Sequence, residues 1–514
     1  MSLVFLLLGL LSGTARAGSA VAFIEISDDG PALVDLVGIS AEGPRKAPAA
    51  PVDAGAWLEV LDAEGRTLAR VPVPDARQRS VILPEGGGAS VTLAAAIAPV
   101  TFAWPDGATH VRLGAQTLAP RAAPPTTPVP VQESGPSDAR LDMVFLGDGY
   151  TEAELPDFAA DVDRMVAYLL SIEPYGAYTG LFNIWRVDAA SAESGASHRE
   201  NGQDVSRDTA YGCYYGCGNI ARLVCCQDSA VMAEVRASVP DADGVLVLIN
   251  DDTYGGAGGF SYATAYTGGA YDTQVAAHEL GHSLIGLWDE YSYGYAANGE
   301  GPNCTADSGG ATWTQWLDER EVGAYPVCSY TNLFRPTDAS CMMNTLQDDY
   351  CPVCREQAVL GIYGRLPSLL VAAEPAPGAV TVDAAQTFTA TALGPDDGSL
   401  TWRWTLDGAL LSETDAVTLE GCGPSGALTL EVADPTPWVR LDPDGLLTDA
   451  ATWEVTRAPC GADDSGADSD DADDSGGGGI SPKGCGCGSV GGAGALWLAG
   501  LVFAVRRRRV DSPR

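Results

Sequence analysis

The chain has 514 residues, and a typical length of about 150 residues per domain predicts about three domains with additional tails. Its 29 lysine and arginine residues are outnumbered by 68 aspartate and glutamate residues, so the formal net charge is -39. Nucleic-acid binding requires a basic surface that displaces counterions from phosphate, and we therefore expect no nucleic-acid partner.

Residues 1–17 are predicted to be a secretory signal peptide. An apolar run over residues 3–11 is followed by Thr14-Ala15-Arg16-Ala17, whose small residues fit cleavage after Ala17. The alternative for this run is a buried apolar strand. The signal peptide predicts that the protein is exported.

Two regions are predicted to be β-sandwiches. In residues 18–123, short apolar runs alternate with glycine, proline and aspartate turns, which is typical of a small sandwich. Residues 124–137 follow as a proline-rich, extended linker. In residues 367–460 short strands alternate again without helical periodicity, which predicts an immunoglobulin-like module.

The region between these modules, residues 138–366, alternates strand and helix patterns and is predicted to be an α/β domain. Thr151 and Glu154 form a capping box before a helix whose apolar residues recur at helical spacing. Strands of the buried type are predicted at residues 141–146, 182–187 and 245–250.

The C-terminal tail divides into a spacer and a hydrophobic segment. Residues 461–484 are rich in aspartate, serine and glycine and are predicted to be a disordered spacer. Residues 485–509 contain a cysteine motif, an apolar stretch from Val490 to Val505 and an arginine cluster. This arrangement resembles bacterial C-terminal sorting signals that a myxosortase-type protease processes. The resemblance implies a processing protease as partner, membrane contact through the tail and a cell-surface location; an ordinary transmembrane anchor is the alternative.

The segment His278-Glu279-Leu280-Gly281-His282 carries the strongest chemical signal. On a helix, residues four apart lie on one face, so both imidazoles can bind one zinc ion. The Glu279 carboxylate can take a proton from zinc-bound water, which is the chemistry of this motif in metallopeptidases. Asp272 or Thr273 is the predicted N-cap of the helix. An accidental match on a surface helix is the alternative, and it is disfavoured because the whole chain has 4 histidines.

A catalytic zinc needs a third protein ligand, and no histidine follows His282 in the sequence. In the metzincin pattern H-E-x-x-H-x-x-G-x-x-H, a glycine turns the chain and the third ligand follows three residues later. Here Gly286 stands one residue late. Alignment on this glycine predicts Asp289 as the third ligand, with Glu290 as the alternative. A solvated acidic helix end is the alternative to a metal-binding role for either residue.

Longer segments around these residues resemble the IgA-specific metallopeptidase family. The resemblance covers roughly residues 138–366 and implies a zincin-like, metzincin-related catalytic domain preceded by a β-sandwich. It also implies that Met342 or Met343 forms a Met-turn that packs beneath the zinc. The segments that carry the resemblance are Phe145–Thr151, Phe182–Asp188, Ser191–Gly195, His278–Tyr291, Ser340–Met343 and Cys351–Glu356.

Further residues are candidates for substrate binding. Tyr291 and Tyr350 could each donate a hydrogen bond to the tetrahedral oxyanion, with simple packing as the alternative. The glycine-rich residues 255–259, with residues 260–265 after them, occupy the place of the edge strand that binds extended substrate in zincins. They lack the Gly-Lys-Ser/Thr ending of a Walker-type phosphate loop.

The chain has 13 cysteines, and in an exported protein they favour disulfides. Cys422 and Cys460 could form a disulfide within one late domain. Cys351-Pro352-Val353-Cys354 has the form used by redox enzymes and structural zinc sites, but a second such motif is absent. The oxidising compartment favours a disulfide near the catalytic site.

The residues together predict a secreted or surface-anchored zinc endopeptidase that hydrolyses peptide bonds of extracellular proteins. Glu279 would act first as base and then as acid, on an extended polypeptide substrate. The alternatives are a surface adhesin with a vestigial zinc site and an enzyme that uses the same zinc geometry on non-peptide amides. The sequence does not identify the substrate protein.

Overall fold

The computed structural model describes residues 19–39, 56–82, 87–122, 128–202 and 204–460. The predicted signal peptide, spacer and sorting signal lie outside these residues. Within them, no helix is both long enough and apolar enough to cross a membrane.

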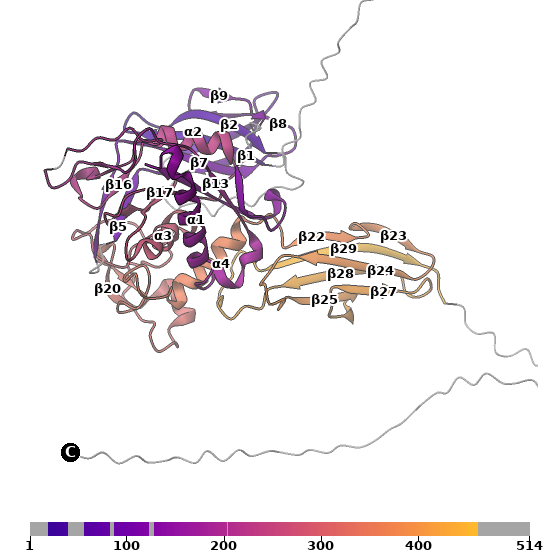
Figure 1. Ribbon diagram of the computed structural model, residues 1–514. Helices are drawn as coiled ribbons and strands as arrows, with labels where there is room; N and C mark the ends of the chain where they lie inside the picture. Colours follow the sequence, from indigo (N-terminus) through magenta and orange to yellow (C-terminus); the bar gives the residue numbers. More distant parts are fainter. Residues whose placement is uncertain (1–18, 40–55, 83–86, 123–127, 203, 461–514) are drawn as a thin grey trace, which may run out of the picture. The chain divides into compact units, whose positions relative to one another are not determined.

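The N-terminal region forms two sheets that share one apolar core (Figure 1). Ala22 and Ile24 pack there against Leu58 and Val60 of the other sheet, because alternate side chains of a strand point to one face. In order, the first sheet contains β10 (Arg121–Ala122), β2 (Ala32–Ile39), β1 (Ser19–Ser27) and β7 (Ala95–Ala103). The second contains β4 (Thr67–Val73), β3 (Ala56–Asp62), β8 (Ala108–Leu113) and β9 (Gln116–Leu118).

A separate hairpin of β5 (Gln78–Ile82) and β6 (Gly88–Thr92) lies against the central region. Ser80 and Gly258 form an antiparallel bridge, in which Ser80 N–H donates to the Gly258 carbonyl at 3.1 Å and Gly258 N–H donates back at 2.9 Å. Val81 is buried in a small apolar cluster with residues of the central region. The hairpin therefore joins the two regions.

The central region is built on a six-stranded sheet whose four inner strands are parallel. Every residue of β12 and β17 is buried, because a parallel sheet is covered on both faces. The strands predicted at residues 141–146, 182–187 and 245–250 correspond to β12, β13 and β17. In order, the sheet contains β11 (Val129–Gln132), β13 (Phe182–Val187), β12 (Leu141–Asp148), β17 (Gly244–Ile249), β19 (Ala263–Tyr266) and β18 (Gly256–Ala257).

Helices cover both faces of this sheet (Figure 1). Phe158 of α1 and Val275 of α3 belong to the core on one face, and Val231 of α2 belongs to the core on the other. The predicted capping box precedes α1, where the Thr151 N–H and hydroxyl donate to Glu154 Oε2 at 2.9 and 2.7 Å. The α-helices of the described residues are α1 (Leu155–Leu169), α2 (Asp228–Ser238), α3 (Asp272–Leu280) and α4 (Pro352–Arg365).

Short elements complete the central region. They are η1 (Ser137–Ala139), η2 (Glu152–Glu154), η3 (Tyr175–Ala177), η4 (Thr179–Leu181), β14 (Ser197–His198), β15 (Tyr214–Tyr215), η5 (Cys217–Asn219), β16 (Val224–Cys225), η6 (Gly281–Ile285), η7 (Ala311–Trp316), β20 (Tyr325–Cys328) and β21 (Tyr330–Arg335).

The start of α3 differs from the prediction by one residue. Its N-cap is Tyr271 and Asp272 is the first helical residue, so the N-cap predicted at Asp272 or Thr273 is wrong. Asp272 instead accepts from the Gly268 N–H at 2.8 Å and pairs with Arg164 at 2.7 Å. Its carboxylate still lies in the first turn, where the helix dipole favours negative charge.

Four disulfides connect described cysteines, and the predicted pair of Cys422 and Cys460 is among them. The disulfide predicted near the catalytic site is formed by Cys304 and Cys328, next to Asp289, and not by the C-x-x-C motif, because Cys351 and Cys354 are buried free thiols, as is Cys341. Cys351 is the N-cap of α4, and its sulfur accepts from the Cys354 N–H at 3.5 Å instead of bonding to the Cys354 sulfur. The disulfides are Cys213–Cys226, Cys217–Cys225, Cys304–Cys328 and Cys422–Cys460.

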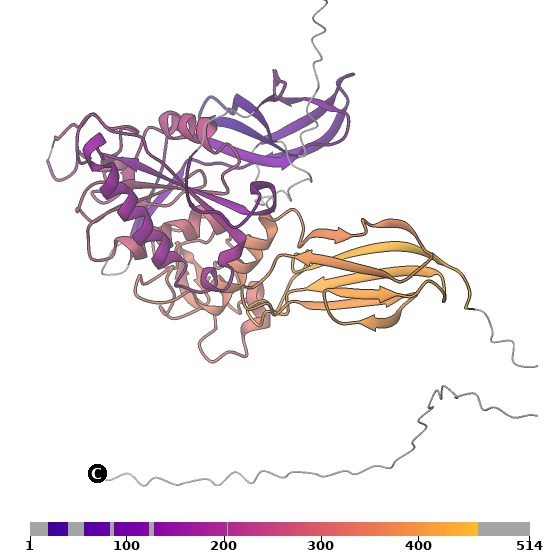
Figure 2. The same cartoon turned by 45° about the vertical axis from the view of Figure 1, so that its right-hand side comes forward.

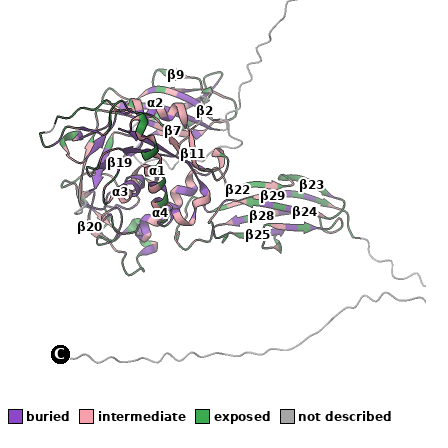
Figure 3. Ribbon diagram, viewed as in Figure 1, coloured by how far each residue is buried: buried purple, intermediate pink, exposed green. Residues whose placement is uncertain are grey.

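The C-terminal region again has two sheets (Figure 2). They enclose one core, in which Phe388, Trp404 and Trp453 are fully buried. Exposed and buried residues alternate along several of its strands, as Figure 3 shows. In order, one sheet contains β22 (Leu370–Glu374), β24 (Gln386–Ala392) and β27 (Ala416–Leu419). The other contains β23 (Gly378–Val382), β29 (Thr448–Arg457), β28 (Gly426–Ala433), β25 (Thr401–Leu406) and β26 (Ala409–Ser412).

A buried carboxylate joins the C-terminal region to the central one. Asp434 Oδ2 accepts from the hydroxyl of Tyr178 at 2.7 Å and from that of Tyr363 at 2.6 Å. All three side chains are buried, so water cannot readily replace either bond.

Replacement of Asp434 by alanine is expected to destabilise the protein, because two buried hydroxyls would lose their acceptor. We expect the free energy of unfolding, measured by denaturant titration of the full chain, to fall by about 2 to 4 kcal/mol. Asp397→Ala, an exposed aspartate of the same region, is the control and should change it by less than about 0.5 kcal/mol. Equal effects of the two substitutions would contradict the stabilising role given to the buried hydrogen bonds of Asp434.

Candidate active site and metal centre

The predicted site residues lie where α3 ends. His278 and Glu279 belong to its last turn, and His282 lies in η6, a π-helical turn that continues it. The helix ends at Gly286, whose φ of 81° is in the left-handed region that glycine adopts without strain. A π-helical turn spans one residue more than an α-helical turn, which accounts for the late position of Gly286 relative to the metzincin pattern.

Three ligand atoms converge beyond the end of this helix. Asp289 Oδ1 lies 3.1 Å from His278 Nε2 and 3.2 Å from His282 Nε2. The two Nε2 atoms are themselves 3.2 Å apart. A tetrahedral zinc ion with bonds of about 2.0–2.1 Å needs such ligand atoms about 3.3 Å apart. The triangle has nearly the size that one zinc ion requires.

Backbone carbonyls fix the orientation of both imidazoles. His278 Nδ1 lies 2.9 Å from the Met342 carbonyl, and His282 Nδ1 lies 2.7 Å from the Leu287 carbonyl. A carbonyl only accepts hydrogen bonds, so each Nδ1 carries the hydrogen. In the neutral rings each Nε2 therefore presents a lone pair to the point where the three atoms meet.

The electrostatics of this triangle favour a positive charge. Burial alone would raise the pKa of Asp289, but the charge of His282 and hydrogen bonds from both imidazoles hold that pKa well below its usual range. Burial alone would lower the pKa of His282, but the Asp289 carboxylate raises it to about 9. Burial lowers the pKa of His278. The carboxylate that attracts a proton to this place also attracts a metal cation.

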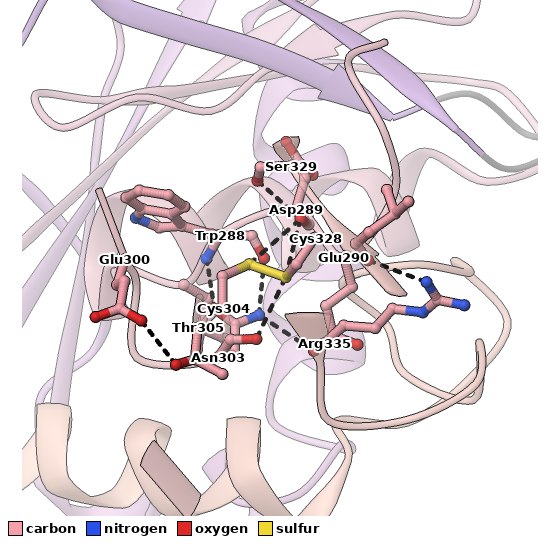
Figure 4. Close-up of a disulfide and its surroundings, with 12 residues drawn as sticks. Trp288, Asp289, Glu290, Glu300, Asn303, Cys304, Thr305, Cys328, Ser329 and Arg335 are labelled. Atoms are coloured by element: carbon pink, nitrogen blue, oxygen red, sulfur yellow. Dashed lines mark hydrogen bonds between the residues drawn. A yellow bond between two sulfur atoms is a disulfide. The ribbon is translucent and has the colours of Figure 1, made fainter. Parts of the chain in front are cut away.

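Asp289 is held on both its side chain and its backbone. The Tyr293 hydroxyl donates to Asp289 Oδ2 at 2.5 Å, which leaves Oδ1 directed to the histidines. The Ser329 hydroxyl donates to the Asp289 carbonyl at 2.8 Å, beside the disulfide of Cys304 and Cys328 (Figure 4). The sequence prediction missed Tyr293 and Ser329, because turns bring them to Asp289 without a periodic pattern.

Glu290 points away from the histidines, although it is adjacent to Asp289. Its Oε1 accepts from the Asn303 side-chain N–H at 3.1 Å and lies 3.1 Å from the sulfur of Cys354. Asn303 also bonds the backbone N–H and carbonyl of Trp288, each at 2.8 Å (Figure 4). The structure thus brings Asp289 to the two histidines and Glu290 to a different environment.

Glu279 is fully buried next to the ligand triangle. Its Oε2 lies 3.9 Å from His282 Nε2, and neither carboxylate oxygen has a hydrogen-bond partner of good geometry among the described residues. Burial raises its pKa well above the usual range. The backbone of Gly258 passes so close that a Cβ there would lie 2.6 Å from Glu279 Oε2 and 2.3 Å from His282 Cδ2. Only glycine fits at this position.

The two methionines and two tyrosines of the prediction also surround the helix. Met342 supplies the carbonyl that His278 bonds, and a Cβ at Gly281 would lie 3.0 Å from the Met343 sulfur. The Tyr350 hydroxyl already donates to the Ala277 carbonyl at 3.0 Å. The Tyr291 ring lies parallel to that of His278, with centroids 6.4 Å apart, and its buried hydroxyl has no hydrogen-bond partner within the described ranges.

The glycine-rich segment contributes β18, the edge strand of the central sheet, and the adjacent Gly258. The outer side of this edge is already paired: the Gly256 N–H donates to the Arg222 carbonyl at 3.2 Å, and Ser80 of β5 bonds the backbone of Gly258. The Ile82 backbone N–H approaches Glu279 closely enough to lower its pKa in part. No signal in the sequence indicated this contact between the N-terminal region and the site.

Comparison with known proteins agrees with this geometry. Residues 129–321 match the family model described as IgA Peptidase M64, a metallopeptidase family whose substrates are polypeptides. The match includes the central sheet, α3 and both acidic residues after it, and it ends before Met342. It identifies this region as a metallopeptidase domain. No curated protein matches the chain.

Replacement of Tyr293 by phenylalanine is expected to weaken metal binding, because Asp289 would lose the hydrogen bond that orients it. We expect the affinity for zinc, measured by competition with a chromophoric chelator, to fall about 10-fold to 100-fold. Tyr295→Phe is the control, since this neighbouring ring is 49% exposed. An affinity unchanged in Tyr293→Phe would show that Asp289 does not depend on this hydroxyl for metal binding.

Proposed function

We propose that this protein is an exported zinc endopeptidase that hydrolyses peptide bonds of extracellular proteins. The observation that carries the proposal is the convergence of His278 Nε2, His282 Nε2 and Asp289 Oδ1 within 3.2 Å of one another. The metallopeptidase match over residues 129–321 supports the same reaction class.

The residues fit a zinc ion by their chemistry. Two imidazole lone pairs and one carboxylate oxygen face each other in a buried place, where their mutual repulsion is not screened by water. Nitrogen and carboxylate ligands in a set of three are the protein ligands of catalytic zinc, which keeps its fourth position open. His278, His282 and Asp289 would hold the ion, and Glu290 is not needed.

The chemistry of the reaction divides between the ion and Glu279. When bound, zinc supplies Lewis acidity that polarises the scissile carbonyl and makes a water molecule acidic near neutral pH. Glu279 accepts the proton of the attacking water and then delivers it to the leaving amine. Burial raises the pKa of its carboxyl, which makes the carboxylate a stronger base for the first of these proton transfers.

Other residues around the site have supporting roles in the proposal. The Tyr291 hydroxyl has no fixed partner among the described residues and is the better candidate to donate to the oxyanion, whereas the Tyr350 hydroxyl is bound to the Ala277 carbonyl. Met342 and Met343 form the Met-turn, with the Met342 carbonyl orienting His278.

The wider architecture supports export and extracellular action. Four disulfides among the described residues indicate an oxidising compartment. In the proposal, a zincin-like domain lies between an N-terminal β-sandwich and an immunoglobulin-like module, and the C-terminal tail directs the protein to the cell surface or is cleaved there.

Replacement of Glu279 by glutamine tests the catalytic role. The amide has the same shape but cannot accept the proton, so kcat/KM on a peptide library should fall at least about a thousandfold while zinc content stays at the wild-type value. Glu300→Gln, an exposed glutamate on the loop near Trp288, is the control and should remain active.

Other outcomes separate the remaining alternatives. Retained hydrolysis in the Glu279→Gln variant would overturn the assignment of the base. Stoichiometric zinc in the wild type without cleavage of any peptide would favour an adhesin with a vestigial site. Cleavage of non-peptide amides alone would assign the same geometry to another substrate class.

A further inference from the structure

A second cluster of metal-ligating side chains lies behind the active site. Cys341, Cys351 and Cys354 are free thiols, and together with Glu290 they place one ligand atom each within 4.8 Å of one another. Every member is buried, with exposed fractions of 3% or less. We propose that these four residues bind a second, structural zinc ion.

The ligand set fits zinc. Cys351 and Cys354 have the C-x-x-C spacing of structural zinc sites, and four buried protein ligands without an open position distinguish such sites from catalytic ones. Tetrahedral zinc with bonds of about 2.3 Å to sulfur needs sulfur atoms about 3.8 Å apart, which lies within the spread of this cluster. Three thiolates and one carboxylate carry the same formal charge as the four thiolates of an all-cysteine zinc site.

The surroundings of the cluster favour its charged form. Cys351 caps the N-terminus of α4, where the helix dipole stabilises thiolates. Backbone N–H groups approach two of the sulfurs, that of Cys351 at 3.4 Å from Cys341 Sγ and that of Cys354 at 3.5 Å from Cys351 Sγ. Glu290 Oε2 is buried and has no hydrogen-bond partner among the described residues, which is costly unless a cation is its partner.

Such an ion would link three segments that the catalytic site depends on. Glu290 follows Asp289 directly, Cys341 precedes Met342, and α4 packs beneath both. The second ion would therefore hold the third catalytic ligand and the Met-turn in one arrangement. Binding of this second ion does not require peptidase activity, because its ligands include none of the three atoms that converge at the catalytic site.

The test uses the full chain with both catalytic histidines replaced, His278→Ala with His282→Ala, which leaves the cluster untouched. We expect two zinc ions per wild-type chain and one in this variant, and X-ray absorption should show three sulfur ligands for the remaining ion. Loss of all zinc from the variant, or retention of zinc without sulfur ligands, would overturn the proposal.

A reciprocal pair of substitutions separates the two metals, because the two carboxylates are adjacent. Asp289→Asn should release the ion without sulfur ligands, and Glu290→Gln should weaken the sulfur-bound ion more than the other one. A sulfur-bound ion in a protein without peptidase activity would refute the proposed function and uphold the second site. A disulfide among Cys341, Cys351 and Cys354 in peptides mapped without reductant would refute the second site alone.

A different observation concerns access to the catalytic site, and the inference from it rests on the proposed function. His278, Glu279 and Asp289 are all 0% exposed and the His282 side chain is 9% exposed, although a polypeptide substrate must reach the ion that these residues would hold. The cover is the β5–β6 hairpin of the N-terminal region. Ser80 pairs with Gly258 at the sheet edge, and a Cβ at Gly88 would lie 2.3 Å from the Tyr291 ring.

The hairpin is anchored by complementary contacts. Arg79 is 1% exposed, with its guanidinium carbon 4.5 Å from the Tyr262 ring centroid and its nitrogen 3.6 Å from Asp228. The Tyr254 hydroxyl donates to the Ile82 carbonyl at 2.9 Å. An extended segment that pairs with a sheet edge beside the catalytic residues binds as a substrate strand would. We infer that this hairpin holds the peptidase latent until it is displaced.

Displacement can be measured without relying on catalysis. In Ser80→Pro, which removes the N–H that bonds Gly258, and in Arg79→Ala, which removes the anchor, we expect a chelator to remove the catalytic zinc at least about tenfold faster than from wild type. Cleavage of a fluorogenic peptide should rise by a similar factor. Arg70→Ala, an exposed arginine on β4, is the control.

The outcomes distinguish latency from the proposed function. Equal rates of zinc loss in wild type and both variants would overturn latency, whatever the peptidase activity. Faster zinc loss without any peptide cleavage in the variants would support the proposal that the hairpin covers the site and would refute the proposed peptidase function. Two variants that disturb different contacts guard against a substitution that simply prevents folding.

Discussion

The proposed catalytic site depends on one unfavourable arrangement, the confinement of two imidazole nitrogens and a carboxylate oxygen within 3.2 Å of one another. Unless a proton or a metal ion lies between them these groups repel each other, and water is not present in bulk to screen them. The fold imposes the arrangement through the carbonyls of Met342 and Leu287 and the hydroxyl of Tyr293. The packing of the surrounding chain thus holds the three ligand atoms together, and a bound metal relieves their repulsion.

The two acidic residues after Trp288 show how one short segment can serve two sites. The two adjacent side chains point to different sides of this segment, so Asp289 reaches the histidines while Glu290 reaches the Cys354 thiol of α4. The backbone is fixed between them, because Ser329 bonds the Asp289 carbonyl and the Met343 carbonyl accepts from the Glu290 N–H at 2.8 Å. A shift in one site would therefore displace the ligand of the other.

Local patterns predicted the parts of this molecule that are themselves local. The buried strands of the central region, the capping box of Thr151 and the helix with the two histidines follow from periodicity and spacing. Alignment on Gly286 pointed to Asp289 because the left-handed residue that ends a helix fixes where the chain turns. The π-helical turn that shifts this glycine left no separate signal in the sequence.

Contacts between distant segments could not be predicted from local patterns in the sequence. A C-x-x-C motif in an exported chain favoured a disulfide, because exported proteins fold in an oxidising compartment. The structure instead places these two thiols in one cluster with Cys341 and Glu290, which come from distant parts of the sequence. Likewise, Ser80 and Tyr293 carry no pattern that links them to the site. The disulfides expected in an oxidising compartment are formed by four other cysteine pairs among the described residues, and the three thiols behind the active site remain free.

The bridge between Ser80 and Gly258 places the N-terminal region in direct competition with substrate. Gly258 must lack a side chain because its backbone passes against His282 and Glu279, and the only hydrogen-bonding groups it offers there are its N–H and carbonyl. Both are used by the chain's own strand, so a substrate can pair at this residue only in the fraction of molecules whose hairpin has left. The apparent affinity for substrate falls by that fraction, and each 1.4 kcal/mol by which the hairpin favours the closed form lowers it about tenfold. Contacts of Arg79 with Tyr262 and Asp228 would then set the activity of the enzyme without changing the chemistry of its site.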